Sequence, residues 1–203
     1  INRDADLVLI AVNDDAIAGV AKKLEHFSGT VVHTSGSVGM DVLKRSARRG
    51  VLYPLQTVSG NRPLRLKNIP LCVEASGKET KKLLHTIAGT LSHDVHDINS
   101  GERRKLHLAA VFVNNFSNHL YTLAEEYLRT NRLSFNLLRP LILETAKKAV
   151  ENSPAKSQTG PAARNDTRTI SAHLALLKKN KQMKKIYTDL TASILERSRQ
   201  KRS

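Results

Sequence analysis

The sequence has almost no cysteine and no long apolar run. Cys72 is the single cysteine among 203 residues, so an internal disulfide is excluded and a reducing compartment is indicated. No stretch approaches the roughly 18 apolar residues that cross a membrane, and the N-terminus lacks the basic-then-apolar pattern of a secretion signal. These absences predict a soluble, cytoplasmic protein without a membrane partner.

Acidic residues are also scarce in the second half of the chain. Residues 1–100 hold 13 Lys and Arg against 10 Asp and Glu, whereas residues 101–203 hold 20 against 8. Such a basic excess is typical of a surface that binds nucleic acid or another polyanion, or of a solvated helix face. Because only Tyr187 interleaves with the basic run and no nucleic-acid motif occurs, we expect a solvated face and no nucleic-acid partner.

Apolar runs of strand length alternate with helical patterns in the first half of the chain. Residues 7–12, 30–33 and 50–53 predict strands, and a helix is expected after the first strand and a brief one after the second. A further strand at 70–75, a helix at 77–91 and a short strand at 92–98 follow. The pattern predicts an α/β fold with a parallel, Rossmann-like sheet.

From about residue 100 the pattern becomes wholly helical. Helices are predicted at 106–128, at about 135–152, from a cap at Asp166 or Thr167 to Leu177, and around residues 183–194. Pro140 should kink the second of these or delay its start. We therefore predict a Rossmann-like domain at residues 1–99 and an all-helical domain at residues 100–203.

The longest predicted helix, residues 106–128, is apolar on nearly every side in its first half. A helix of this kind is expected to be enclosed by protein. Asn114, Asn115, Asn118 and His119 lie in that apolar setting, and a buried amide without a partner costs about 1–3 kcal/mol. The amides therefore either bond to other helices, in a core or a dimer interface, or face a cavity that takes a ligand.

Polar loops follow three of the predicted strands. In open α/β sheets, ligands lie at the carboxyl ends of the strands. The loops are residues 11–14, 33–37 and 53–57, and together they favour a ligand cleft at one sheet edge. Each loop also has a plain structural explanation. Asn13 and Asp14 can cap a helix, His33 can be a hydrogen-bonded structural residue at the end of its strand, and Pro54 can simply shape a turn. From the third loop we select Tyr53 and Gln56 as candidate substrate-binding residues.

Five segments of the chain resemble one family of proteins. They read DADLVLIAVNDDAI, VVHTSGSVGMDVL, GVLYPLQTVS, HLAAVFVNNFSNHLYTLAEEYL and SQTGPAARND. In this order they are similar to Rossmann-like proteins that carry the domain known as DUF2520, which are related to pyrroline-5-carboxylate reductases and 6-phosphogluconate dehydrogenase-like enzymes. The resemblance implies an NADP-dependent oxidoreductase and a homodimer formed through the helical domain.

The resemblance also implies a glycine-rich loop that binds the cofactor pyrophosphate. No G-x-G occurs in the chain, and it begins INRDAD, without methionine, directly before a strand. We therefore expect a chain that lacks its beginning and binds NADP poorly by itself. The family implies cofactor contacts from the first two loops, carried here by the following residues: Val12, Asn13, Asp14, His33, Thr34, Ser35 and Gly36.

The long helix supplies the candidate catalytic residues under this resemblance. Related hydroxyacid dehydrogenases carry a lysine and an asparagine one turn apart on this helix, but Ala110 and Val111 stand where the lysine would fall. This difference argues against hydroxyacid dehydrogenation. Asn115 and His119 share the equivalent face, so we predict His119 as the acid–base residue and Asn115 as a substrate ligand. No metal site is predicted.

The sequence leaves more than one function open. The leading hypothesis is hydride transfer between NADP and a small carbonyl or imine substrate. A non-catalytic dinucleotide-binding or sensing module is the second, favoured by the missing lysine. Nucleic-acid binding is the third, and it predicts salt-sensitive binding that weakens when Lys178, Lys179, Lys184 and Lys185 are neutralised. The polar loop at residues 158–166 either closes over a ligand or simply connects two helices.

Overall fold

The computed structural model describes residues 4–57 and 65–200. The chain divides into two compact units, residues 1–118 and 119–203. The first unit contains the sheet, and the second is helical. The assignment of residues 1–99 and 100–203 as separate functional domains stays a prediction.

The first unit is built on a five-stranded sheet with the strands in sequence order. The strands are β1 Leu7–Ile10, β2 Thr30–His33, β3 Arg48–Pro54, β4 Leu71–Ala75 and β5 Val95–Asp97. The first three are parallel, but β4 is antiparallel to β3, and β5 is parallel to β4. The predicted α/β class with a mainly parallel, Rossmann-like sheet is confirmed, and the β3–β4 pair is the antiparallel exception. Pro54, the last residue of β3, pairs with Leu71, the first residue of β4. The chain therefore reverses direction between the end of β3 and the start of β4.

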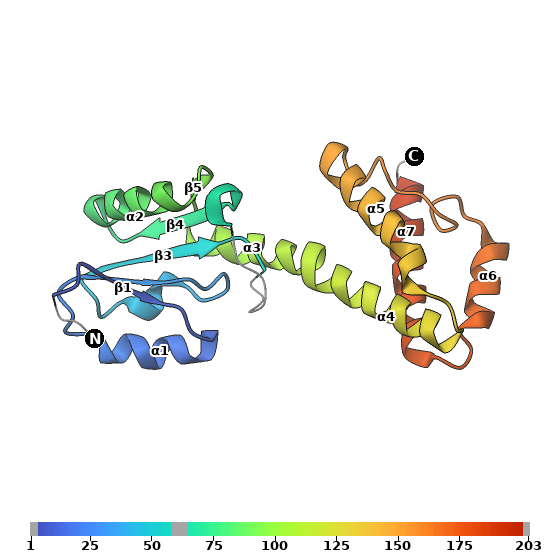
Figure 1. The fold of residues 1–203 in the computed structure, drawn as a ribbon, viewed down its shortest axis with the longest axis horizontal. Helices are drawn as coiled ribbons and strands as arrows, with labels where there is room; N and C mark the ends of the chain where they lie inside the picture. The colour runs from blue at the N-terminus through green and yellow to red at the C-terminus, as the bar shows by residue number, and fades with distance from the viewer. Residues whose placement is uncertain (1–3, 58–64, 201–203) are drawn as a thin grey trace. The chain divides into compact units, whose positions relative to one another are not determined.

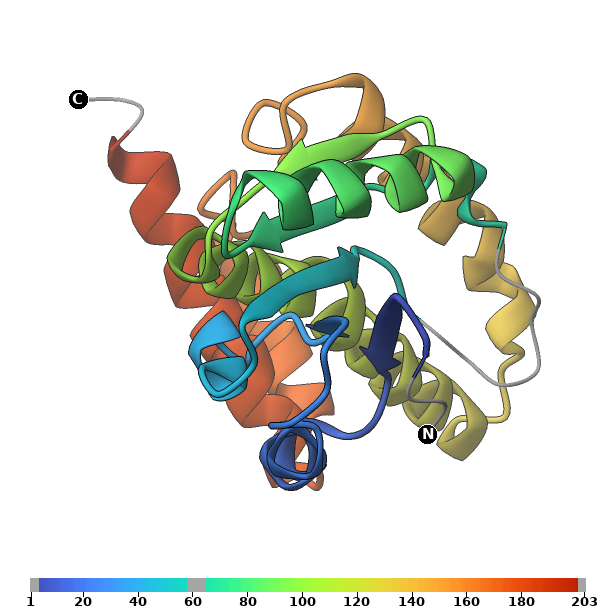
Figure 2. The same cartoon turned by 90° about the vertical axis from the view of Figure 1, so that its left-hand side faces the viewer.

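Two helices cover opposite faces of this sheet (Figures 1 and 2). Helix α1, Asp14–Lys23, packs Ile17 and Ala21 against one core cluster, which includes Val31. Helix α2, Lys78–Leu91, packs against the other cluster, which includes Val32. Consecutive strand residues point to opposite faces, so cover on both sides explains why all four residues of β2 are buried. The short 3₁₀ turns η1, Met40–Leu43, and η2, Leu66–Asn68, complete the connections.

Helix α3, Ser100–Ala110, leaves the sheet after β5. Its start is fixed by a capping box, in which the Asn99 side chain accepts a hydrogen bond from the Glu102 backbone and the Glu102 carboxylate accepts one from the Asn99 backbone. A π-helical segment, η3 Val111–Phe116, follows without a break and leads into α4, Ser117–Thr130. The predicted start of the helical region near residue 100 is confirmed.

The second unit contains the remaining helices. They are η4 Phe135–Leu138, α5 Arg139–Glu151, α6 Thr167–Leu176 and α7 Lys181–Gln200. Pro140 stands in the first turn of α5, so it delays the start of that helix, as one of the two predicted outcomes had it. Asp166 caps α6 by accepting a hydrogen bond from the Thr169 backbone, which confirms the predicted cap. None of the helices formed by the described residues is both long and apolar enough to cross a membrane.

The single chain does not enclose the long helix, so the predicted enclosure by protein would require a second chain. Leu108 and Phe112 are each 60% exposed, Val113 is 76% exposed and Phe116 is 49% exposed. Only the side of α3 toward the sheet is covered, where Leu106 packs against the cluster around Tyr53 and Cys72. Within one chain, apolar residues on every side of this helix therefore do not have neighbours on every side.

Candidate functional site

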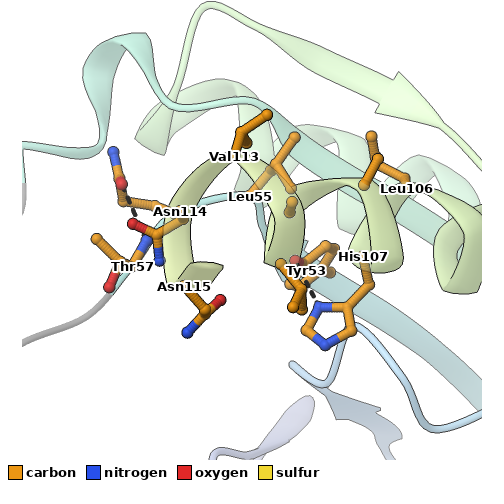
Figure 3. Close-up of a pocket in the computed structure, with 12 residues that line it drawn as sticks. Tyr53, Leu55, Thr57, Leu106, His107, Val113, Asn114 and Asn115 are labelled. Carbon is orange, nitrogen blue, oxygen red and sulfur yellow. Dashed lines mark hydrogen bonds between the residues drawn. The ribbon is translucent and has the colours of Figure 1, made fainter. Parts of the chain in front are cut away.

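A pocket of about 540 Å³ lies between the end of β3 and the helix α3–η3. Its size falls within the range of roughly 300–1,000 Å³ found for small-molecule sites. Figure 3 shows Tyr53 beside His107 at one end and Thr57 with Asn114 and Asn115 at the other. The lining residues are Tyr53, Leu55, Gln56, Thr57, Leu106, His107, Ala109, Ala110, Val111, Val113, Asn114 and Asn115.

Tyr53 and His107 form a hydrogen-bonded pair in this pocket. The phenol oxygen of Tyr53 lies 3.2 Å from Nδ1 of His107, and the two rings meet edge to face at 72°. Burial raises the pKa of the Tyr53 hydroxyl, and Cys72 adds to the rise while the charge of Arg103 opposes it. Tyr53 therefore keeps its proton at neutral pH.

Gly36 connects the loop after β2 to this pair. A Cβ atom at Gly36 would lie 2.6 Å from Nδ1 of His107 and 2.8 Å from Cζ of Tyr53, closer than atoms in van der Waals contact. The backbone approaches the two rings so closely that no side chain fits. The loop predicted to contact a cofactor thus touches the residues that line the pocket.

The π-helical segment η3 forms the wall that carries Asn114 and Asn115. Its wider turn is reflected in the Ser117 hydroxyl, which donates to the carbonyl of Phe112 five residues earlier at 3.3 Å. Segments of this kind are frequent at functional sites. Residues beyond Val111 are rotated relative to the face expected from a period of 3.6. The segment therefore sets which side chains of the helix line the pocket.

The loops after β1 and β2 are joined by hydrogen bonds between their side chains. The Ser37 hydroxyl donates to the carboxylate of Asp14, and the Ser35 hydroxyl accepts from the backbone of Ser37 at 3.1 Å and of Val38 at 3.0 Å. Burial raises the pKa of the Asp14 carboxyl, but hydrogen bonds from Ser37 and Ser35 and the charges of His107 and His33 outweigh it. The pKa of Asp14 therefore lies below its ordinary value, and the group is negatively charged at neutral pH.

His33 lies wholly inside the protein at the end of β2. Its Nδ1 accepts a hydrogen bond from the Ser35 backbone at 3.2 Å, whereas Nε2 has no hydrogen-bond partner among the described residues. Burial lowers the pKa of His33 to about 4, and the charge of Arg103 adds to this effect; the Gly39 backbone, Glu74 and Asp14 oppose it. His33 is therefore neutral at pH 7. Its hydrogen bond with the Ser35 backbone helps to hold the loop after β2 in place.

The buried, neutral state of His33 predicts a loss of stability in acid. Because its folded-state pKa lies near 4 and the unfolded value near 6.5, the unfolded chain takes up a proton that the folded chain does not. The free energy of unfolding should be unaffected above pH 6.5 and fall by about 3 kcal/mol as the pH drops to 4. Urea unfolding at pH 7 and pH 4 measures this difference.

The matched variants for this experiment are His33→Asn and His26→Asn. Asparagine retains an acceptor for the Ser35 backbone but does not titrate, so His33→Asn should lose much less stability between the two pH values. His26 is exposed, and its replacement should leave the acid loss as large as in the parent protein. An equal acid loss in the parent and in His33→Asn would contradict the assignment.

A buried charge network holds α3 against the sheet. Arg103 is fully enclosed and forms an ion pair with Glu74 of β4, and its guanidinium also donates to the Val38 carbonyl at 2.6 Å. The Ser100 hydroxyl lies 2.7 Å from a Glu74 carboxylate oxygen and accepts from the Met40 backbone at 3.0 Å. The network fixes the first turn of α3, and His107 stands one turn beyond Arg103.

The structure brings some of the predicted site residues together and leaves others apart. Tyr53, Gln56 and Asn115 line one pocket, and Gly36 packs against its Tyr53 end. Val12, Asn13 and Asp14 are exposed after β1, and Thr34 is half-buried after β2. His119 is an exposed residue of α4 in the second unit and is not one of the residues that line this pocket. The catalytic and cofactor assignments of all these residues stay predictions.

Sequence reasoning missed His107 and Arg103, whereas Asn114, which also lines the pocket, was among the amides expected to face either other helices or a cavity. His107 lies seven residues before Asn114, which is two turns of a helix, so their shared face was present in the sequence. Arg103 gave no such indication, because its partner Glu74 lies 29 residues away on a strand. Only the packing of α3 on the sheet brings that ion pair together.

A Rossmann-like α/β protein with a helical C-terminal region is the class that this fold defines. The chain belongs to the family described as "Domain of unknown function (DUF2520)", which residues 69–194 match. The resemblance seen in the sequence is thereby confirmed. No curated protein matched the chain.

Solved structures agree with this placement. A candidate NADP oxidoreductase from Bacteroides fragilis is 41% identical, with a TM-score of 0.91 over 97% of this chain and 77% of that one. A protein from Thermotoga maritima is 22% identical, with a TM-score of 0.82 over 96% of this chain and 80% of its own. An imine reductase from Streptomyces aurantiacus is 13% identical, with a TM-score of 0.65 over 93% and 74%. The last two similarities concern the fold alone.

Proposed function

We propose that this protein is an NADP-dependent oxidoreductase that transfers a hydride to or from a small carbonyl or imine substrate. The observation that carries the proposal is the Tyr53–His107 pair at the end of the pocket, in contact with the loop after β2. The similarity to the candidate NADP oxidoreductase from Bacteroides fragilis supports the reaction class and the cofactor.

The residues after β1 and β2 fit the nicotinamide and ribose part of such a cofactor. Val12 offers an exposed apolar surface, and the Asn13 amide, which makes no capping hydrogen bond, is free to receive polar groups of a ligand. The Asp14 carboxylate already accepts one hydrogen bond, from the Ser37 hydroxyl. It has further oxygen lone pairs that can accept a hydrogen bond from a ribose hydroxyl. We assign Val12, Asn13, Asp14 and Thr34 to direct contacts. His33, Ser35 and Gly36, all buried, shape the loop that carries them.

The bound nicotinamide would supply or accept the hydride, and the pocket residues would handle the proton. In the reducing direction Tyr53, which is protonated at neutral pH, donates its hydroxyl proton to the substrate oxygen or nitrogen. His107, in the tautomer that carries its hydrogen on Nδ1, stabilises the resulting phenolate by a hydrogen bond until the phenolate regains a proton from solvent. The Asn114 and Asn115 amides orient the polar part of the substrate. The predicted acid–base role of His119 is thus not needed for this step.

Calorimetric titration of the natural protein with NADPH tests the proposal. Binding is expected, together with oxidation of NADPH when ketones or imines are added. The variant Asn13→Ala, which removes an exposed amide from the proposed cofactor surface, should weaken NADPH binding about threefold to tenfold. Asn152→Ala, on the second unit, is the control and should bind as the parent does. No detectable binding of NADPH or NADH by the natural protein would exclude the function.

A specific observation also favours a non-catalytic dinucleotide-binding or sensing module. Ala110 and Val111, at the position where related dehydrogenases carry a lysine, are apolar and line the pocket. Under this alternative NADPH binds tightly, no carbonyl or imine is turned over, and Tyr53→Phe has no activity to change.

We also propose a homodimer formed through the helical region. Leu108, Phe112 and Phe116, which recur every four residues, leave an apolar stripe uncovered in the single chain. Contiguous exposed apolar surface of this kind marks interaction sites more often than free surface. The family resemblance points to a second copy of the chain as the partner.

A further inference from the structure

We propose that the pocket selects carbonyl or imine substrates that carry no anionic group, with an apolar arm in place of a carboxylate. The inference rests on the proposed oxidoreductase function and specifies its substrate class. It follows from the chemistry of the pocket walls and from the charges of Arg103 and Asp14.

The side chains that line the pocket are apolar or neutral amides and hydroxyls, apart from His107. Among the described lining residues there is no lysine, arginine, aspartate or glutamate. The apolar part comprises Leu55, Leu106, Ala109, Ala110, Val111 and Val113. A carboxylate that enters such a site loses its hydration without gaining a partner of opposite charge, which is strongly unfavourable.

The nearest buried cation is not available to a substrate. Arg103 lies one turn before His107, but its side chain has no exposed surface. Its guanidinium is paired with Glu74 and donates to the Val38 carbonyl. The charge of Arg103 is therefore compensated inside the protein, and its donors do not reach the pocket.

The charge that does act on the Tyr53–His107 end is negative. Asp14 is charged at neutral pH, and its interaction with His107 contributes to that state. Nδ1 of His107 is hydrogen-bonded to the Tyr53 hydroxyl. A substrate carboxylate at this end would meet repulsion from Asp14. A neutral ketone, or an imine that becomes protonated, meets no such penalty.

The test compares two ketones that differ in one group. The probes are 5-methylhexan-2-one and 4-oxopentanoate, in which a carboxylate replaces the isopropyl group at the same distance from the carbonyl. Their dissociation constants are measured by NMR titration of the natural protein saturated with NADPH. The neutral ketone is expected to bind about tenfold more tightly or better, because the carboxylate has no counter-charge. Equal or tighter binding of the acid, or no binding of either, would overturn the inference.

A charge-adding variant with a matched control separates charge from shape. Val113 lines the pocket and is 76% exposed, so Val113→Lys adds a cation there without disturbing the core. It should improve binding of 4-oxopentanoate about tenfold and narrow the preference for the ketone. Val150→Lys, at an 87% exposed position of α5, should leave both constants unchanged. If Val113→Lys prefers the neutral ketone over 4-oxopentanoate as strongly as the parent protein does, charge is not the property by which the pocket selects its substrate.

Oxidation of NADPH, recorded with the same samples, distinguishes this inference from the proposed function. Preference for the neutral ketone with no NADPH oxidation by any ketone or imine would exclude the oxidoreductase and leave the ligand class supported. Turnover of 4-oxopentanoate in preference to the ketone would support the oxidoreductase and overturn the ligand class.

Discussion

Replacing Tyr53 with phenylalanine is expected to lower kcat of the proposed reduction by about 10²–10⁴-fold, the usual contribution of a positioned proton donor. Phenylalanine keeps the ring that packs against Gly36, so the fold and the pocket should be retained. KM should change little, because the hydroxyl acts mainly on the proton transferred with the hydride. Steady-state rates of NADPH oxidation with a neutral ketone or imine measure the effect.

The second unit offers a matched control for this variant. Tyr187 and His173 form the same kind of pair, with the phenol oxygen 2.9 Å from Nδ1 and the rings edge to face at 81°. Tyr187→Phe removes that hydrogen bond outside the pocket and should leave kcat unchanged. Equal rates for Tyr53→Phe and the parent would show that Tyr53 does not supply the proton. Equal losses in both variants would point to a general loss of folding.

Replacing Glu74 with leucine is expected to lower the free energy of unfolding by about 3–5 kcal/mol, because it leaves the enclosed Arg103 charge without a partner. The Ser100 hydroxyl loses its acceptor as well, so the first turn of α3 loses two contacts with the sheet. Urea unfolding at neutral pH, followed by circular dichroism, measures the change.

Two further variants separate the buried ion pair from ion pairs in general. Glu25→Leu breaks an exposed pair with Arg45 and should leave the unfolding midpoint nearly unchanged, since exposed pairs contribute little. The double variant Glu74→Leu with Arg103→Met removes both buried charges and should recover much of the stability lost in Glu74→Leu. A double variant as unstable as the single one would show that the unpaired charge is not the cause.

Much of the first unit could be predicted because strands and helices leave local patterns in the sequence. The apolar run of β1 and the cap of α3 are determined by neighbouring residues, as is the cap of α6 in the second unit. The direction of β4 is not, because a strand buried on both faces reads the same in a parallel and an antiparallel pair. The exposure of α3 and η3 in the single chain could not be predicted for a related reason: composition reports that a surface is apolar, and not what covers it.

The candidate site was predictable in part. Tyr53 and Gln56 follow a strand, so the rule that ligands lie at strand ends was enough to select them. The pairing of Asn115 with His119 assumed a regular α-helix, and the π-helical segment at residues 111–116 changes the side that each later residue faces. His107 depends on contacts with Gly36 and Tyr53, which lie 71 and 54 residues away. Partners so distant leave no local pattern.

The two contacts between α3 and the sheet have the same spacing along the helix as along the strand. Glu74 pairs with Val51 across the strands, so the Arg103 ion pair stands at the level of Val51, and the His107 hydrogen bond stands two residues further along β3 at Tyr53. Two strand residues advance about 7 Å, and the four helical residues from Arg103 to His107 advance about 6 Å. The two contacts on the helix therefore have nearly the same spacing as their partners on the strand. One residue inserted between Arg103 and His107 would turn the imidazole about 100° around the helix axis and away from the phenol.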